Sequence, residues 1–246
     1  MIPESGGPVA AELIADLAAA SRILAAQGVV DGFGHVSIRH PDAPDRFFLA
    51  RSIAPASVVP GDIVEYDLDS NACNADGRNE INERFIHGQI YRARPDVMSI
   101  VHSHSPSVIP FGLVDVSMKA MFHNAAFVAA GVPVFDISEQ FGATDMLVSD
   151  NPKGVALAEC LGGNHVAMMR GHGAVACGDS LPMAVFRAAY TEVNARIQHW
   201  AQALGGDKPI AALNDEEGAI ADVPNSKACM RAWNLWREEL GEQIDW

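Results

Sequence analysis

The sequence predicts an α/β fold with one central sheet in a single domain. Short segments rich in Val, Ile and Phe alternate with longer segments of helical periodicity, and this alternation is typical of a sheet flanked by helices. The chain has 246 residues, of which 49% are hydrophobic, so it can bury one sizeable core. We find no internal repeat or low-complexity tract. We therefore treat residues 1–246 as one domain.

The first part of the chain is predicted to form a helix followed by three strands. Residues 9–27 carry three leucines close to one helical stripe, and Gly28 is placed to end that helix in a left-handed conformation. Runs of β-branched and aromatic residues between Pro and Gly turns then predict strands at 34–40, 46–50 and 62–68.

The remaining elements follow a polar loop that begins after the third strand. A helix is expected at 82–94, because Pro95 closes the pattern, and a strand at 97–104. Two short strands are expected within 165–178, and a long helix at 182–204. A polar connector to Ser226 then leads to a short helix at 227–240, which packs on the domain or on a neighbouring subunit.

Charge and cysteine content limit the partners and the compartment. The 31 acidic and 17 basic residues give a net charge of −14, which opposes binding to nucleic acid and to anionic substrates. An anionic small molecule would need a local positive centre, such as a metal ion. The four cysteines are far apart and predict free thiols in a reducing cytoplasm. Charged residues interrupt the apolar N-terminal segment, so we expect neither a signal peptide nor a membrane span.

Two histidines at the end of a predicted strand are candidate metal ligands. Residues i and i+2 of a strand point to the same face, so His102 and His104 can direct their imidazoles at one point. Flanking Ile100 and Val101 indicate a buried strand, where unpartnered imidazoles are costly. The alternative is a pair of packing histidines.

A third histidine and a glutamate complete the candidate site. His172 lies between two glycines, which permit a turn that can direct the imidazole at a metal, although such a run can also be only a turn. Three imidazoles with an open position are typical of a catalytic metal site. Glu83 is predicted in the first turn of its helix, on one face with His87 and Tyr91. It could act as a base or a ligand, or only support the helix dipole.

These residues together resemble the signature of the class II aldolase and adducin family. The run of Glu83, His87, Tyr91 and Pro95 precedes the H-x-H strand, and the G-H-G turn with His172 follows later. The resemblance covers roughly residues 9–205. It implies an α/β/α sandwich with a central, mostly antiparallel sheet, and a homotetramer with its sites at subunit boundaries.

The resemblance also assigns roles to the candidate residues. His102, His104 and His172 would bind one divalent metal ion per subunit, with zinc, manganese and iron left open, and Glu83 would be the catalytic acid/base. Family members that act on sugar phosphates have an asparagine after the glycine, where this chain has His35 after Gly34. They also have a hydroxyl-rich loop that binds the phosphate, and most of its hydroxyl residues are missing at residues 50–55 of this chain.

Those departures favour a carboxylate over a phosphorylated sugar as substrate. The sequence is most similar to the branch with hydroxypyridine-dicarboxylate and dihydroxyphthalate decarboxylases, on the basis of His35, Arg51 and Ser52 together with the helix and strand motifs. Gly34, His35, Arg51 and Ser52 are therefore the expected substrate-binding residues. The Arg51 guanidinium suits a carboxylate, although it could also be a solvated strand-end arginine.

The expected function is that of a metal-dependent carbon–carbon lyase, foremost a decarboxylase of a hydroxylated aromatic or heteroaromatic carboxylate. An aldolase acting on a non-phosphorylated hydroxy-carbonyl compound is the alternative. A non-catalytic adducin-like interaction module is less consistent with the retained histidines and glutamate. A homo-oligomer is also expected because Phe111, Phe122, Phe127 and Trp233 exceed what one small domain readily covers.

Overall fold

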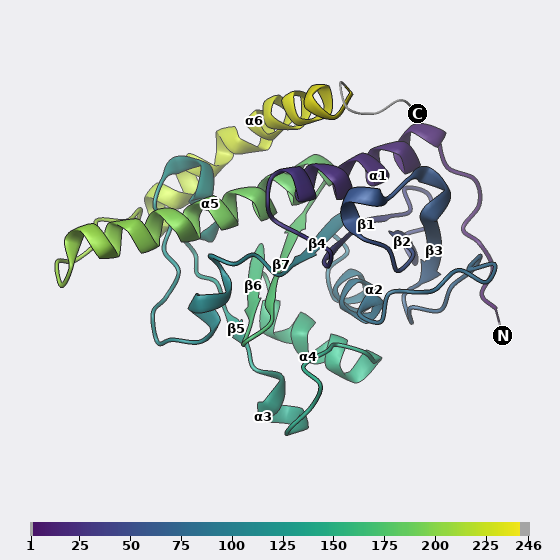
Figure 1. The fold of residues 1–246 in the computed structure, drawn as a ribbon, viewed down its shortest axis with the longest axis horizontal. Helices are drawn as coiled ribbons and strands as arrows, with labels where there is room; N and C mark the ends of the chain where they lie inside the picture. The colour runs from purple at the N-terminus through teal and green to yellow at the C-terminus, as the bar shows by residue number, and fades with distance from the viewer. Residues whose placement is uncertain (1, 242–246) are drawn as a thin grey trace.

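A seven-stranded sheet runs through the centre of the computed structural model, which describes residues 2–241 (Figure 1). The strands lie in the order β3-β2-β1-β4-β7-β6-β5. All neighbouring pairs are antiparallel except β5 and β6. The bounds are β1 His35–Arg39, β2 Arg46–Ala50, β3 Ile63–Asp67, β4 Ser99–Ser103, β5 Val134–Phe135, β6 Val166–Met169 and β7 Gly173–Gly178. The predicted central and mostly antiparallel sheet is confirmed.

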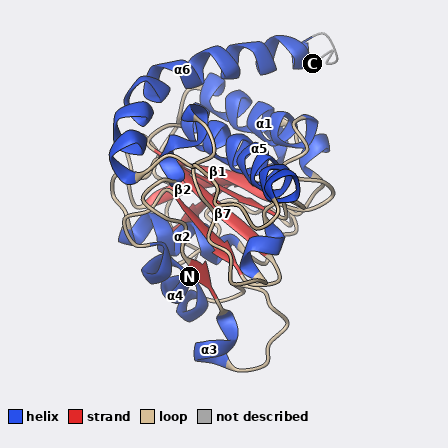
Figure 2. Ribbon diagram, turned by 90° about the vertical axis from the view of Figure 1, so that its left-hand side faces the viewer, coloured by secondary structure: helices blue, strands red, loops and turns tan. Residues whose placement is uncertain are grey.

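Helices cover both faces of the sheet (Figure 2). One hydrophobic core lies between the sheet and α1, α5 and α6, and a second lies under α2 and α4. The helices are α1 Ala11–Ala26, α2 Arg84–Ala93, α3 Ile137–Phe141, α4 Asn151–Leu161, α5 Leu181–Gly205 and α6 Asp215–Gly241, with 3₁₀ turns at Pro55–Ser57, Pro60–Asp62, Ile109–Gly112 and His123–Val128. Within residues 2–241, no helix is both long and apolar enough to cross a membrane. The expected single-domain α/β/α sandwich is confirmed.

Side chains of the central strands alternate between the two cores. On β4, Val101 packs into the core under α1 and α5, whereas Ile100 packs into the core under α2. His102 lies two residues after Ile100 and therefore also faces α2. The register pairs His35 of β1 with His102, so both histidines point to the same side of the sheet. This side carries the site.

The predicted elements before residue 105 agree with the structure to within a few residues. Helix α2 begins at Arg84 instead of residue 82, so Glu83 immediately precedes the helix and does not lie in its first turn. The long helix predicted at 182–204 is α5. Between residues 105 and 164 we predicted no element, and the structure adds β5, α3 and α4 there.

The prediction for the C-terminal helix was wrong in extent. The polar connector expected before Ser226 is helical from Asp215 onward, and α6 runs from there through Pro224 to Gly241. A reciprocal cap begins this helix: the Asn214 side chain accepts from the backbone N–H of Glu217 at 2.9 Å, and the Glu217 carboxylate accepts from the backbone N–H of Asn214 at 3.0 Å. This cap, and packing of the first turns on the 3₁₀ turn at 123–128, outweigh the lost hydrogen bond at the proline.

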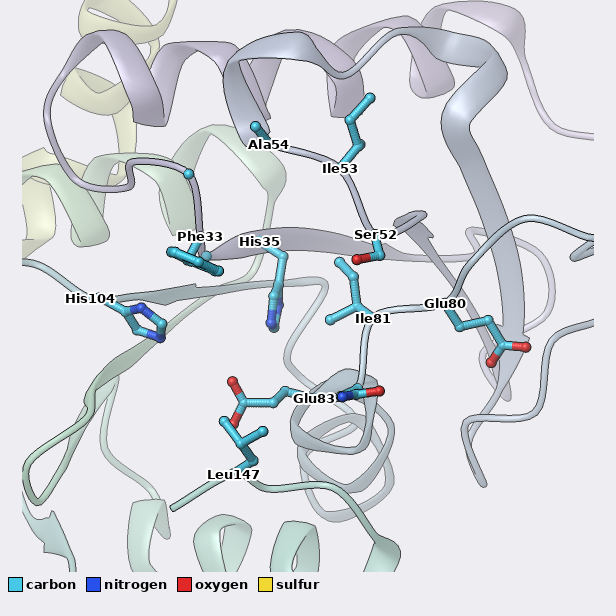
Figure 3. A pocket seen from close by; sticks show the side chains of 13 residues that line it. Phe33, His35, Ser52, Ile53, Ala54, Glu80, Ile81, Glu83, His104 and Leu147 are labelled. Carbon is cyan, nitrogen blue, oxygen red and sulfur yellow. The ribbon is translucent and has the colours of Figure 1, made fainter. Parts of the chain in front are cut away.

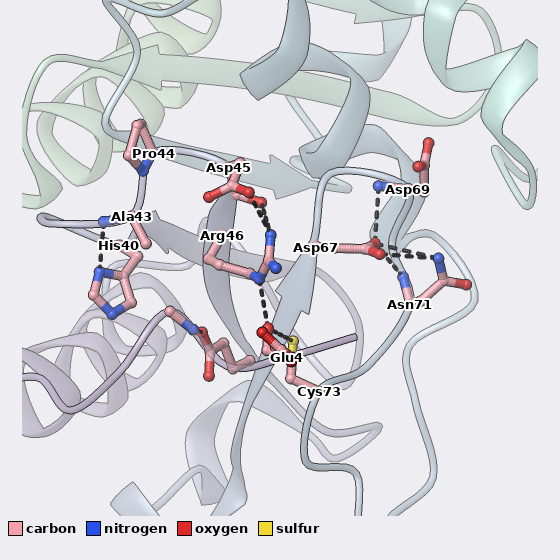
Figure 4. A network of polar contacts seen from close by, with 12 residues as sticks. Glu4, His40, Ala43, Pro44, Asp45, Arg46, Asp67, Asp69, Asn71 and Cys73 are labelled. Atoms are coloured by element: carbon pink, nitrogen blue, oxygen red, sulfur yellow. Dashed lines mark hydrogen bonds and ion pairs between the residues drawn. The ribbon is translucent and has the colours of Figure 1, made fainter. Parts of the chain in front are cut away.

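The segment before α1 is tied to the edge of the sheet by polar contacts. Arg46 of β2 donates from Nε to the carbonyl oxygen of Glu4 at 2.9 Å (Figure 4). The carboxylate of Glu65 on β3 accepts from Ser5 Oγ and from the backbone N–H of Gly6, both at 2.6 Å. The edge strand is therefore partly covered by the chain itself.

The aromatic residues expected to favour oligomers are largely covered within one chain. Phe111, Phe127 and Trp233 are each less than 9% exposed, and Phe122 packs against the core under α1 and α5. This basis for expecting an oligomer was wrong, because Phe127 and Trp233 pack into the core with α1 and α5, and Phe111 stacks on His199 of α5. Other large apolar side chains, such as Trp200, are exposed instead.

Candidate active site

Four side chains suited to metal binding converge at one end of the sheet. Glu83 precedes α2, His102 lies on β4, His104 follows that strand, and His172 lies in the turn between β6 and β7. One possible ligand atom from each lies within 4.8 Å of the others. The Nε2 of His104 is 3.1 Å from that of His102 and 3.0 Å from that of His172. The structure thus brings the three predicted ligands and the predicted acid/base together.

The glycines on either side of His172 determine where its ring lies. Gly171 has a φ of 64°, a left-handed conformation that glycine adopts without strain. Gly173 lies so close to β4 that an added Cβ would be 2.0 Å from the carbonyl oxygen of Ser103. A side chain at either position would therefore move His172 away from His104.

Hydrogen bonds to the backbone orient two of the four groups. Nδ1 of His102 donates to the carbonyl oxygen of Ala174 at 3.1 Å, which directs its Nε2 at the cluster as a possible metal ligand. Oε1 of Glu83 accepts from the backbone N–H of Val148 at 3.0 Å. The other oxygen, Oε2, lies 3.5 Å from Nε2 of His102 and 3.4 Å from Nε2 of His172.

This donor set fits a divalent cation. A neutral imidazole has one N–H, so three Nε2 atoms that meet at one point cannot all be satisfied by one another. Burial, followed by the neighbouring His102 and His172, lowers the pKa of His104 to about 4, so its ring is neutral at pH 7. Burial raises the pKa of Glu83, but hydrogen bonds and charge interactions with His102 and His172 outweigh it and lower the pKa. Three imidazoles and a carboxylate are suitable ligands for zinc, manganese or iron.

A cavity of about 400 Å³ opens beside the cluster (Figure 3). Its walls include Gly34, His35 and Ser52, three of the four residues predicted to bind substrate. Figure 3 shows the rings of His35 and His104 and the carboxylate of Glu83 facing a common space. The further lining residues are Gly32, Phe33, Ile53, Ala54, Glu80, Ile81, Asn82 and Leu147.

Behind His35, a chain of polar groups leads into the interior. Nδ1 of His35 lies 2.6 Å from Nε2 of His87, and Nδ1 of His87 lies 2.6 Å from Oγ of Ser37. Oγ of Ser37 also lies 2.7 Å from the hydroxyl of Tyr91. Burial, followed by the neighbouring histidines, lowers the pKa of His35 well below its usual value, and burial is also the main reason why the pKa of His87 falls to about 3.

Arg51, the fourth predicted substrate-binding residue, does not line the cavity. Its Nε donates to Oδ1 of Asp62 at 2.6 Å, and its side chain is 35% exposed. In this arrangement the guanidinium is paired within the chain, next to the loop whose Ser52 side chain reaches the cavity. A role for Arg51 in substrate binding stays a prediction.

Sequence reasoning missed two features of the site. The ring of Phe33 stacks beside that of His104, with 6.3 Å between ring centroids, and forms part of the cavity wall. An aromatic residue between Gly32 and Gly34 just before a strand was the available signal. The backbone N–H of Val148, which holds Glu83, carries no sequence signal, because every residue except proline has that donor.

Comparison with known proteins places this chain in a family. The model of the Class II Aldolase and Adducin N-terminal domain matches residues 15–199. Decarboxylase tropJ of Talaromyces stipitatus is 35% identical over 239 residues, which cover 89% of this chain and 90% of that protein. The 3,4-dihydroxyphthalate decarboxylase of Arthrobacter keyseri is 28% identical over 91% of both chains.

The solved structures agree on the fold. An aldolase II superfamily protein from Pseudomonas syringae superimposes with a TM-score of 0.79 at 21% identity, and the match covers 96% of this chain and 95% of that one. The family model and the relatives named as decarboxylases support a lyase enzyme. The fold of this family usually binds a divalent metal, and the cluster of His102, His104, His172 and Glu83 provides suitable ligands. The chain belongs to the class II aldolase and adducin family, as its motifs predicted.

Proposed function

We propose that this chain is a divalent-metal-dependent decarboxylase of a hydroxylated aromatic or heteroaromatic carboxylate. The observation that carries the proposal is the convergence of Glu83 and three histidine Nε2 atoms beside a cavity lined by His35. The names of the relatives, which include a 3,4-dihydroxyphthalate decarboxylase, support this reaction class.

The cavity suits a flat substrate with polar substituents. About 400 Å³ is enough for one substituted aromatic ring. Phe33, Ile81 and Leu147 offer apolar walls, and His35 and Ser52 offer polar contacts for a carboxylate or hydroxyl group. Ser52 is the one hydroxyl side chain among the described residues that line the cavity, so the hydroxyl-rich phosphate loop of the sugar-phosphate enzymes has no counterpart there. We therefore propose a substrate without a phosphate group.

His102, His104 and His172 would hold the metal ion, with Glu83 next to it. When bound, a divalent ion supplies a Lewis acid that stabilises negative charge on the oxygens of the substrate. Zinc, manganese and iron all suit this set of ligands, and we propose one ion per subunit.

Glu83 is proposed to move the proton of the reaction. Its lowered pKa means that it begins as a carboxylate, which takes the proton of the substrate's ring hydroxyl as the substrate binds. The bond between the ring and its carboxylate then breaks, carbon dioxide leaves, and the electron pair stays on the ring carbon. Glu83 returns its proton to that carbon, and the phenolate product takes a proton from water.

Product analysis tests this function. The purified protein would be incubated with a panel of hydroxyaromatic acids, with added metal or with a chelator, while carbon dioxide and aldehydes are measured. We expect metal-dependent carbon dioxide and a ring product that has lost one carboxylate. Aldehyde release from a hydroxy-carbonyl compound, with no carbon dioxide from any acid in the panel, would instead identify an aldolase.

A further inference from the structure

The polar groups behind His35 form a row of hydrogen bonds, and the bond distances indicate which group donates to which. Four groups are joined by three short contacts: His35 to His87, His87 to Ser37, and Ser37 to Tyr91, at 2.6, 2.6 and 2.7 Å. Ser37, His87 and Tyr91 are each at most 1% exposed, so water does not compete for these bonds. Each of these three groups must therefore place its proton on another group of the protein.

Neutral imidazoles and hydroxyls allow only two arrangements of these protons. In the first, Tyr91 donates to Ser37, Ser37 donates to Nδ1 of His87, and Nε2 of His87 donates to Nδ1 of His35. The proton of His35 itself then lies on Nε2. In the second, every bond is reversed, and the proton of His35 lies on Nδ1.

The end of the chain at Tyr91 favours the first arrangement. If every bond were reversed, the Tyr91 hydroxyl would have to donate to the carbonyl oxygen of Met98, which lies 3.5 Å away. That distance is at the limit of a hydrogen bond, and the same oxygen already accepts the backbone N–H of Arg39 at 2.8 Å. In the first arrangement the Tyr91 proton has a partner at 2.7 Å. A buried donor without a good partner is costly, so the hydrogen bonds are donated in the order Tyr91 to Ser37, Ser37 to His87 and His87 to His35.

We propose that Ser37 and His87 are positioning residues that fix the proton of His35 on Nε2, so that this ring donates a hydrogen bond to an anionic oxygen of the substrate. The inference rests on the proposed function, because it assigns the group that His35 recognises. Within residues 2–241, Nε2 of His35 makes no hydrogen bond to the protein, and the ring lines the cavity. A donor there selects a carboxylate or phenolate oxygen and disfavours a substrate that presents an N–H group.

The position of the ring in the sheet supports this role. His35 is paired in register with the metal-site residue His102, and their ring centroids are 5.0 Å apart. A substrate oxygen near the three-histidine cluster is therefore within reach of His35. Gly34, with a φ of 94°, allows the chain to turn into β1 at this point, where it passes close to the carbonyl oxygen of His102.

Nitrogen NMR tests the proton position directly and does not depend on turnover. Protein with ¹⁵N-labelled histidine would be measured with zinc present, and the His35 signals would be assigned as those lost in His35→Asn. We expect a protonated Nε2 and a bare Nδ1 in the wild type and also in Tyr91→Phe, where Ser37 must still donate to His87. Ser37→Ala removes that donor and should give a mixture of both tautomers. A protonated Nδ1 in the wild type would overturn the proposal.

Kinetics with 3,4-dihydroxyphthalate, the substrate named for a relative, test the consequence. Ser37→Ala should raise KM about 10-fold at unchanged metal content, because a hydrogen bond to a charged group is weakened. Ser99→Ala is the matched control: Ser99 is also buried, but its hydroxyl donates only to the carbonyl oxygen of Ser37 at 2.6 Å, and its KM should stay near the wild-type value.

The NMR and kinetic experiments distinguish failure of the positioning role from failure of the proposed function. A Ser37→Ala enzyme with wild-type KM and a wild-type His35 tautomer would overturn the positioning role. If no hydroxyaromatic acid is decarboxylated, the proposed function fails, while the NMR spectrum still determines how His35 is protonated. If Ser37→Ala does not fold, the wild-type and Tyr91→Phe spectra decide the inference.

Discussion

Single residues from distant parts of the sequence build the metal site, since 68 positions separate His104 from His172. We expect His102→Ala, His104→Ala and His172→Ala each to bind the metal more weakly and to lose it on dialysis, because each variant removes one of the three imidazoles that would hold the ion. Elemental analysis after dialysis measures this loss. His199→Ala, which removes a ring stacked on Phe111, is the control.

His102 differs from the other two histidines because it is fully buried within β4. Its alanine variant also loses packing, so urea unfolding would be measured alongside metal content to separate the two effects. Stoichiometric metal in any folded variant would remove that residue from the set of ligands.

The proton-transfer role of Glu83 predicts a large kinetic effect from a small change. Glu83→Gln keeps the shape of the side chain and its hydrogen bond from Val148, but it removes the group that titrates. Turnover should fall by about 10²–10⁴-fold while metal content is retained, because general acid–base catalysis contributes about that much. Steady-state rates and elemental analysis measure both quantities. More than about a tenth of wild-type turnover would mean that the proton reaches the ring carbon by another route.

Much of the site could be predicted from the sequence because its chemistry depends on residue types. His102, His104, His172 and Glu83 stand in a recognisable spacing. Gly34 and His35 lie at the start of β1 and Ser52 follows β2, where these strands reach the cavity. Arg51 could not be placed, because its pairing with Asp62 depends on the three-dimensional path of the loop. The hydrogen bond from the backbone N–H of Val148 to Glu83 could not be predicted either, because it also depends on the path of a loop.

At the scale of elements, periodicity predicted the strands and the long helices well, and local capping explains the errors. Helix α4 begins where Asp150 accepts from the backbone N–H of Lys153, a cap signal that was present in the sequence but was not used. Helix α6 was shortened in the prediction because the polar residues before Ser226 were interpreted as a connector, and the reciprocal cap at Asn214 was overlooked. The two-residue β5 carries too little pattern to predict.

The turn between β6 and β7 is the element on which the site depends most. Gly173→Ala should destabilise the fold by about 1–3 kcal/mol and weaken metal binding, because the new Cβ would meet the carbonyl oxygen of Ser103 at 2.0 Å. Urea unfolding and metal titration measure both effects. Gly163→Ala is the control, since an added Cβ there meets no atom within 4 Å. Equal stability of the two variants would show that the turn has room to adjust.

At the scale of the whole molecule, the homotetramer stays a prediction, but it now rests on other exposed apolar side chains. The rings first expected at an interface are buried, whereas Phe33, Trp200 and Leu204 are 69%, 64% and 92% exposed. Phe33 also lines the cavity, so a neighbouring subunit that covered it would help to close the site. Light scattering at micromolar concentration should give the mass of four 26.2 kDa chains. A monomer that retains full turnover would contradict an interface that completes the site.

The most direct test of the account is a metal titration of the metal-free enzyme with 3,4-dihydroxyphthalate as the first substrate and other hydroxyaromatic acids after it. Carbon dioxide release should rise in proportion to added zinc, manganese or iron and reach a plateau at one ion per subunit. In deuterated water, the ring carbon that lost its carboxylate should carry one deuterium, because Glu83 receives its proton from an exchangeable hydroxyl group. Carbon dioxide release that persists without metal, or no release from any of these acids at one bound ion per subunit, would contradict the proposed function.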